Sequence, residues 1–205
     1  MFRKTLSGLV LALATTAATA ETRVLCLGDS LTEGYGVARE EAFPALIEAQ
    51  LKAKGVKDVT VVNAGVSGAT SASGLSRLKW HLKAPAKPAV LVLSLGANDG
   101  LRGIDPAATK SNLTEVIDFA KANGMKVLLT GMSMPPNMGR AYIERFEATF
   151  KEVAKTEHVA LMPFLLEGVG GEAKLNLADG VHPNERGHEM IAKRLMAYLE
   201  PLLSR

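Results

Sequence analysis

Five short, uniformly apolar runs alternate with longer segments of helical periodicity along this chain. A strand that is apolar on both faces is typical of a parallel sheet, because helices cover such a sheet on both sides. The alternation therefore predicts an α/β fold: a three-layer α/β/α sandwich around a five-stranded parallel sheet, with the most apolar run, 89–95, at its centre. The predicted strands are 24–27, 59–62, 89–95, 126–130 and 159–163.

Residues that start helices stand between these runs, ahead of apolar residues at helical spacing. Pro44 fits a first helical turn, and Asp105 followed by Pro106 forms a strong pair of N-cap and first helical residue. In the helix predicted around residue 80, we expect Trp80 to be a partly buried packing residue. We expect His81 to lie on the surface of the same helix.

The first twenty residues have the pattern of a cleavable export signal. Arg3 and Lys4 precede an apolar run over 6–14, and Ala18-Thr19-Ala20 gives the small-x-small pattern of a cleavage site. The apolar run is well short of the roughly 20 residues that span a membrane, which argues against a stable membrane anchor. We therefore expect 1–20 to be a signal peptide and 21–205 a single domain. The mature protein would begin at Glu21, in the periplasm or secreted.

The charge balance argues against a nucleic-acid partner. Two of the 24 basic residues lie in 1–20, so 22 basic residues face 21 acidic ones in the expected mature chain. This even balance lacks the basic stripe that nucleic-acid binding needs. Cys26 is the only cysteine, which excludes an intramolecular disulfide. Its place in an apolar run favours a small buried hydrophobe over a nucleophile.

The unusual polar residues all follow predicted strands. Because the carboxyl ends of parallel strands share one edge of a sheet, residues that follow different strands can meet there. Any one of these residues, taken alone, is more often a simple turn residue. In chain order they are Ser30, Asn63, Gly65, Asn98, Asp99, Asp179 and His182.

Three of these residues have the chemistry of a nucleophile and its base. The two residues between Asp179 and His182 let a loop bring the carboxylate back onto the imidazole. Asp179 would then accept from Nδ1–H and leave Nε2 free to take the proton of Ser30. Pro183 disfavours the α region for His182 and so supports a fixed extended presentation. By itself, an Asp-x-x-His pattern also fits a surface turn or half of a metal site.

A serine that attacks a carbonyl creates an oxyanion, which needs several donors aimed at one point. The backbone N–H groups of Ser30 and Gly65 and the side-chain amide of Asn98 can supply three such donors. We therefore predict an oxyanion hole formed by these three residues.

Four blocks of the sequence resemble those of the SGNH (GDSL-type) hydrolases: Gly28–Leu31, Gly65, Gly96–Asp99 and Asp179–His182. They occur in the order typical of that family and span nearly the whole expected mature chain. The extended blocks 28–35 and 96–103 are similar to the exported bacterial branch with acyl-thioesterase, lysophospholipase and arylesterase activities. The resemblance implies a flavodoxin-like sheet and a serine esterase. It also identifies Ser30, Gly65, Asn98 and His182 as the residues for which the family is named.

The resemblance also implies where an acyl chain would bind. In the exported branch, the loop after the asparagine block contacts acyl chains. A methionine-rich loop around Met132, Met134 and Met138 can line an adaptable apolar pocket or simply fill the core. The candidate substrate-binding residues are Leu101, Arg102, Gly103, Ile104, Met134 and Pro135.

We therefore expect a serine esterase that cleaves acyl or aryl esters through an acyl-enzyme, with acyl thioesters and lysophospholipids as further candidate substrates. Ser30 would be the nucleophile, His182 the general base and then acid, and Asp179 its orienter. The mechanism requires no metal and no organic cofactor. Asp29 and Asp99 are expected to tie loops or helix starts.

Two alternatives come from other functional classes. A metal-dependent phosphoesterase would need several ligands at the same edge, and only His182 of the four histidines is expected there. A non-catalytic exported binding module would have no need for Ser30, Asp179 and His182 together. The candidate ligands of the metal hypothesis are Asp29, Asn98, Asp99, Asp179 and His182.

Overall fold

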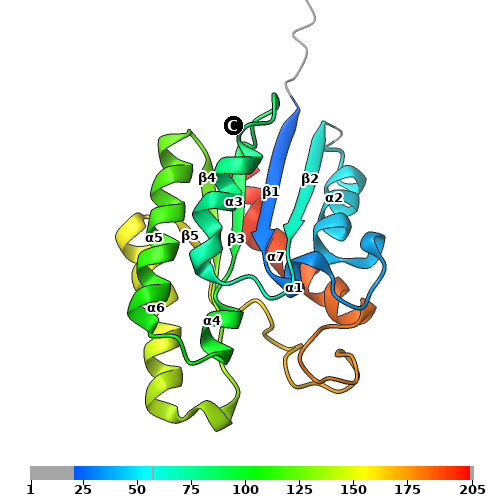
Figure 1. Ribbon diagram of the computed structural model, residues 1–205. Coiled ribbons are helices and arrows are strands. Elements are labelled where there is room, and N and C mark those ends of the chain that lie inside the picture. Colours follow the sequence, from blue (N-terminus) through cyan, green and yellow to red (C-terminus); the bar gives the residue numbers. More distant parts are fainter. Residues whose placement is uncertain (1–20, 57, 204–205) are drawn as a thin grey trace, which may run out of the picture.

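The computed structural model describes residues 21–203 except residue 57, and the predicted signal peptide lies outside the described residues. Its centre is a five-stranded sheet in the order β2-β1-β3-β4-β5, in which every pair is parallel (Figure 1). The prediction of a parallel sheet with the third strand at its centre is confirmed. The strands are β1 Thr22–Gly28, β2 Val59–Gly65, β3 Val90–Ser94, β4 Lys126–Thr130 and β5 Ala160–Met162.

Helices cover both faces of the sheet and complete the three layers (Figure 1). α3, α5 and α6 pack on one face, and α2 and α7 pack on the other. The predicted helix start at Asp105 and Pro106 is confirmed, since the Asp105 carboxylate accepts from the N–H of Ala107 at 3.0 Å. The helices are α1 Ser30–Glu33, α2 Phe43–Ala53, α3 Gly74–His81, α4 Ala97–Leu101, α5 Pro106–Ala122, α6 Arg140–Glu157 and α7 Glu185–Leu203.

The order in which the strands are added to the sheet changes direction next to β1, and this change determines where the site lies. The chain goes from β1 outward to β2 and then crosses to the other side of β1 to form β3. Helices therefore leave neighbouring strands on opposite faces of the sheet, and a crevice opens at the carboxyl ends of β1 and β3. Gly28, at the end of β1, lies in register with Gly65 of β2 and Ser94 of β3.

Trp80 is not the packing residue that was predicted, because 66% of its surface is exposed. α3 buries Gly74 and Leu78, which are four positions apart and share one side of the helix. Trp80 lies two positions beyond Leu78, about 200° around the helix, and so points away from the sheet.

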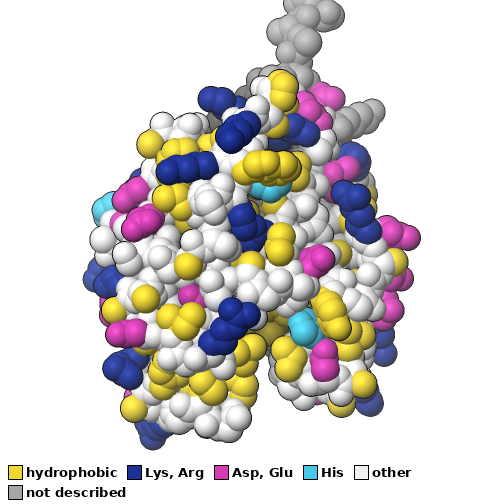
Figure 2. Space-filling view, in the orientation of Figure 1, with side chains coloured by type: hydrophobic (Ala, Val, Ile, Leu, Met, Phe, Trp, Pro, Cys, Tyr) yellow, Lys and Arg dark blue, Asp and Glu magenta, His cyan; other side chains and the backbone are white. Residues whose placement is uncertain are grey.

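No helix in the described part of the chain is both long enough and apolar enough to cross a membrane. Charged side chains of both signs are spread over the face seen in Figure 2.

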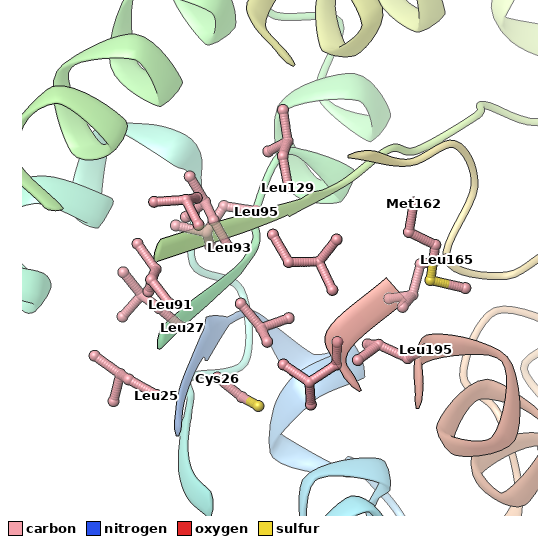
Figure 3. Packing of buried hydrophobic residues seen from close by; sticks show 14 of the residues in the cluster. Leu25, Cys26, Leu27, Leu91, Leu93, Leu95, Leu129, Met162, Leu165 and Leu195 are labelled. Atoms are coloured by element: carbon pink, nitrogen blue, oxygen red, sulfur yellow. The ribbon is translucent and has the colours of Figure 1, made fainter. Parts of the chain in front are cut away.

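The core is a continuous apolar cluster on both sides of the sheet (Figure 3). Leu25, Leu27 and Cys26 of β1 are fully or almost fully buried there. Each buried leucine contributes roughly 1.5–3 kcal/mol relative to an exposed one. Burial raises the pKa of the Cys26 thiol to about 12, so it stays protonated and behaves as a small hydrophobe, as predicted.

Candidate active site

A cavity of about 400 Å³ opens at the carboxyl edge of the sheet. Figure 2 shows the molecule hollowed at this end, between two lobes whose facing sides carry hydrophobic side chains. Ser30 and His182 stand at the cavity, and most of the other lining groups are apolar. The lining residues include Leu31, Ala97, Asn98, Leu101, Met132, Met134, Pro135, Phe164, Leu166, Gly170, Gly171 and Val181.

Ser30 is held at the junction between β1 and α1. Asp29 caps the helix, because its Oδ1 accepts from the N–H of Leu31 at 3.0 Å. Only glycine fits at position 28, where a Cβ would lie 1.9 Å from Oγ1 of Thr32. The turn is therefore tight. It places the Ser30 side chain at the edge of the sheet and the Ser30 backbone N–H at the start of α1.

Asp29 lies beneath the site rather than in the cavity. Its carboxyl group is fully buried, and Oδ2 has no hydrogen-bond partner among the described residues. Burial raises its pKa to about 6, against the lowering effect of the Leu31 N–H and of the nearby Arg77 guanidinium. The expected structural role of Asp29 at a helix start is confirmed.

Ser30, His182 and Asp179 form a continuous hydrogen-bonded relay. Nε2 of His182 lies 2.9 Å from Oγ of Ser30, and Nδ1 lies 2.7 Å from Oδ2 of Asp179. Oδ1 of Asp179 accepts from the backbone N–H groups of His182 and Val181 at 3.0 and 2.9 Å. These two backbone bonds, together with the imidazole, lower the pKa of Asp179 to about 2. The carboxylate is therefore charged and able to hold the Nδ1–H tautomer.

Backbone pairing fixes the turn that carries the relay. Leu177 donates its N–H to the carbonyl of His182 at 2.8 Å, and Asn184 donates to the carbonyl of Leu175 at 3.0 Å. Asn176 and Pro183 form an antiparallel bridge between these two pairs. Tyr35 was not predicted from the sequence as part of the site; its ring centroid lies 4.6 Å from that of the His182 ring, with the two planes inclined at 43°.

α7 follows this turn directly and is anchored by a buried histidine. The N–H of Phe43, at the start of α2, donates to Nδ1 of His188 at 3.3 Å. Burial lowers the pKa of His188 to about 4, so its ring is neutral and can accept that bond. This hydrogen bond joins α7, which follows the relay, to α2, the next α-helix after the one that Ser30 begins.

Asn98 reaches the cavity from α4. Its Nδ2 donates to the carbonyl of Ala69 at 3.0 Å, which leaves the second amide hydrogen free to donate elsewhere. The neighbouring Asp99 is buried and accepts from the N–H of Ser71 at 2.9 Å and from Oγ1 of Thr109 at 3.3 Å. Asp99 thus ties the loop after β2 to α5, as expected.

The assignment of Gly65 to the oxyanion hole needs correction. Its N–H already donates to Oδ1 of Asn63 at 2.9 Å, and a Cβ there would lie 2.0 Å from the backbone nitrogen of Glu33. Gly65 therefore packs behind α1 and is not a free donor. The Asn-x-Gly spacing is that of an Asx turn, in which the Asn side chain binds the N–H two residues on, so the sequence held this signal.

Three residues further on, Gly68 has the free N–H that Gly65 lacks. Gly68 adopts φ +77°, which favours glycine, and its N–H has no hydrogen-bond partner in the described part of the chain. It directly precedes Ala69, whose carbonyl holds the Asn98 amide.

The predicted substrate-binding residues divide into two groups. Leu101, Met134 and Pro135 line the cavity, whereas Arg102, Gly103 and Ile104 do not. Arg102 instead donates to the carbonyl of Gly68 at 3.0 Å, and the carbonyl of Ile104 accepts from the hydroxyl of Tyr142 at 2.8 Å.

Sequence analysis also missed the wall opposite the methionine-rich loop. It comes from the segment after β5, which has no periodicity that would have marked it. Its cavity-lining residues are Phe164, Leu166, Gly170 and Gly171.

The candidate metal ligands do not converge. Among the described residues, no three His, Cys, Asp or Glu side chains are close enough together to hold a metal ion. Asp29 and Asp99 direct their carboxylates to backbone and hydroxyl donors, away from His182. The donor set that a phosphoesterase would need is therefore dispersed.

A serine, a histidine and a carboxylate in relay at the carboxyl edge of an α/β sheet are the arrangement of a serine hydrolase. A model of the GDSL-like lipase/acylhydrolase family matches residues 26–190. The chain therefore belongs to the GDSL-like lipase/acylhydrolase family, which confirms the resemblance found in its sequence.

Its relatives are esterases and thioesterases. The chain is 45% identical over 199 residues to the esterase TesA of Pseudomonas aeruginosa, which covers 97% of this chain and 98% of the relative. It is 38% identical over 204 residues to thioesterase 1/protease 1/lysophospholipase L1 of Escherichia coli, which covers 100% and 96%.

Solved structures agree with these sequence matches. The crystal structure of TesA superposes with a TM-score of 0.85 at 43% identity, over 89% of this chain and 100% of that one. The psychrotrophic esterase EstA from Pseudoalteromonas sp. superposes with a TM-score of 0.83 at 30% identity, over 90% and 100%. The protein is thus a serine esterase of this family.

Proposed function

We propose that the protein hydrolyses esters and thioesters of apolar acyl chains through an acyl-enzyme on Ser30. The observation that carries this proposal is the relay from Ser30 through His182 to Asp179 at the mouth of an apolar cavity. The relatives named esterase, thioesterase and lysophospholipase support the same substrate classes. The test is hydrolysis of aryl esters of graded acyl length, beside an acyl thioester and a lysophospholipid.

The relay supplies each proton that the reaction needs. Oγ of Ser30 attacks the carbonyl carbon while Nε2 of His182 takes its proton, and Asp179 stabilises the imidazolium. The tetrahedral intermediate expels the alcohol or thiol, which leaves with the proton from Nε2. Water then attacks the acyl-enzyme with His182 again as base, and the acid and free Ser30 are released.

The oxyanion would be held by the N–H groups of Ser30 and Gly68 and the Asn98 amide. Asn98→Ala is expected to lower kcat by roughly 10²–10³-fold, about 3–4 kcal/mol, with little change in KM. The reason is that the amide is aimed at charge that develops only in the transition state. The measurement is kcat and KM on a short aryl ester, beside a thermal melt.

Asn112→Ala is the matched control. Its amide donates to Oγ of Ser71 at 2.9 Å, in the loop that Asp99 also ties, and it does not line the cavity. It should lose some stability and keep kcat. A well-folded Asn98→Ala enzyme with unchanged kcat would remove Asn98 from the oxyanion hole.

We infer that the cavity wall formed by the segment after β5 determines which acyl-chain lengths the enzyme accepts. The absence of a side chain at Gly170 would leave room for a long acyl chain. A Cβ at Gly170 would lie 3.4 Å from Cβ of Leu166 and 3.7 Å from Cζ of Phe164, both ordinary contacts. A larger side chain therefore fits the backbone there and extends between two residues that line the cavity. Its neighbour Gly171 adopts φ +79° and would be strained by any side chain.

Gly170→Leu is accordingly expected to exclude two or three methylenes of a long acyl chain. At about 0.8 kcal/mol per buried methylene, kcat/KM should fall roughly 15–60-fold for long-chain aryl esters and stay nearly constant for acetyl esters. Gly170→Ala, which adds one methyl group, is the graded control. Equal losses of kcat/KM on short and long esters would show that the wall does not determine the preferred acyl-chain length.

We also infer export, from the signal-like pattern of residues 1–20. The protein recovered from the periplasm or medium should begin at Glu21, as read by intact mass. Ala20→Asp, which breaks the small-x-small pattern, should retain the leader. A fully active cytoplasmic protein with an intact Met1 would contradict this inference.

A further inference from the structure

An exposed aromatic residue among lysines lies at the end of α3. Trp80, the only tryptophan of the chain, is 66% exposed, and Lys79 before it and Lys83 and Lys87 in the segment that follows α3 are also exposed. We call these four residues the Trp80 patch. The Trp80 ring is the most exposed large hydrophobic side chain in the described part of the chain, and it lies outside both the core and the cavity lining.

The patch is held in place by its surroundings. The Trp80 ring meets the His81 ring edge-on at 4.8 Å, and the Lys79 ammonium lies 5.3 Å from the centre of the Phe119 ring. The loop that follows is tied to β1, because Arg23 donates to the carbonyl of Ala86 at 3.0 Å. The indole is therefore presented outward from a fixed helix end.

The lysines of the patch are available to an outside anion. In the described part of the chain, the carboxylates form their ion pairs with other basic groups and none with Lys79, Lys83 or Lys87. Figure 2 shows Lys and Arg side chains gathered in the upper part of this face, around α3.

Indole between lysines suits the headgroup region of an anionic bilayer. The indole ring is apolar with one N–H donor and favours the membrane–water interface, where lysines meet lipid phosphates. We propose that the Trp80 patch docks the protein reversibly on anionic phospholipid membranes. This inference does not depend on the proposed reaction.

Docking through this patch leaves the cavity open. Lys87 lies three residues before β3 begins at Val90, so the patch is at the amino end of the sheet. The cavity is at the carboxyl end, beyond a five-residue strand that spans roughly 17 Å. A protein docked in this way would face its cavity toward the water phase.

Because Trp80 is the only tryptophan, its fluorescence reports on the patch itself. Vesicles that contain phosphatidylglycerol should shift its emission to shorter wavelength, whereas pure phosphatidylcholine vesicles should not. Added salt should reverse the shift, since it screens the lysines. Equal binding to both vesicle types would overturn the proposal, as would a shift that appears without vesicles when protein concentration rises.

The double variant Lys83→Glu/Lys87→Glu keeps the reporter and reverses two charges. It should bind phosphatidylglycerol vesicles at least about 30-fold more weakly. Lys151→Glu/Lys155→Glu makes the same charge change on α6 and should bind as the parent does. All three proteins carry the same residues 1–20, so any effect of that segment cancels, and hydrolysis of a short soluble ester should be equal. Loss of binding in both variants, or in neither, would overturn the proposal.

Discussion

Replacing Ser30 by alanine is expected to lower kcat by about 10⁴–10⁶-fold and to leave the fold intact. The Ser30 Oγ lies 2.9 Å from Nε2 of His182, and alanine leaves the imidazole with no nucleophile to activate. Removal of a serine nucleophile costs most of the chemical rate enhancement, and the oxyanion donors and binding sustain only a small residual. The measurement is ester hydrolysis with a sensitive aryl ester, with a thermal melt of each protein.

Ser133→Ala is the matched control for this substitution. Ser133 lines the same cavity, but its hydroxyl donates to Glu147 and, among the described residues, forms no hydrogen bond with a histidine. That variant should keep kcat within a few-fold. An organophosphonate should also label the parent protein once and the Ser30 variant not at all. A folded Ser30→Ala enzyme with near-normal kcat would end the acyl-enzyme proposal.

Asp179→Asn is expected to lower kcat by roughly 10³–10⁴-fold through the wrong tautomer of His182. Oδ1 of Asp179 accepts two backbone N–H groups, so the amide oxygen of the variant must take that side. The amide nitrogen then faces Nδ1 of His182, which must accept and leave its hydrogen on Nε2. In that state Nε2 cannot take the proton of Ser30.

Asp105→Asn is the control, since the Asp105 carboxylate also accepts a backbone N–H two residues on, from Ala107, and forms no hydrogen bond with a histidine in the described part of the chain. Its kcat should be unchanged. In the parent protein, the pKa of Asp179 near 2 keeps the carboxylate charged, so a fall in rate between pH 4 and 8 must come from another group. An Asp179→Asn enzyme within ten-fold of the parent would contradict the orienting role.

The sheet and the relay could be predicted because local patterns determine them. β4 occupies the predicted residues, and β3 lies at the predicted centre of the sheet. Uniformly apolar runs that alternate with helices are typical of a covered parallel sheet, and the shared edge of such a sheet brings distant residues together. The 2.9 Å contact between Ser30 and His182 follows from that geometry.

The other features depend on contacts that no local pattern specifies. The N–H of Gly65 donates to the side chain of Asn63, two residues earlier, and is therefore not available to an oxyanion. The nearby N–H without a partner among the described residues is that of Gly68. Trp80 is predicted from the sequence as a partly buried packing residue, but α3 is too short to bury more than one narrow stripe, which consists of Gly74 and Leu78. The cavity wall after β5 follows long-range pairing, such as the Leu165 N–H to the carbonyl of Gly131 at 3.0 Å.

The hydrogen bond between Ser30 and His182 joins residues 152 positions apart. The nucleophile stands just after the first strand, at the start of α1, whereas its base stands just before α7. α7 packs on α2, β4 and β5, and its His188 accepts the Phe43 N–H. A chain still emerging from the ribosome therefore has a serine but no base. Hydrolytic competence arises only when the last helix docks, so recovery of esterase activity during refolding reports completion of the whole fold.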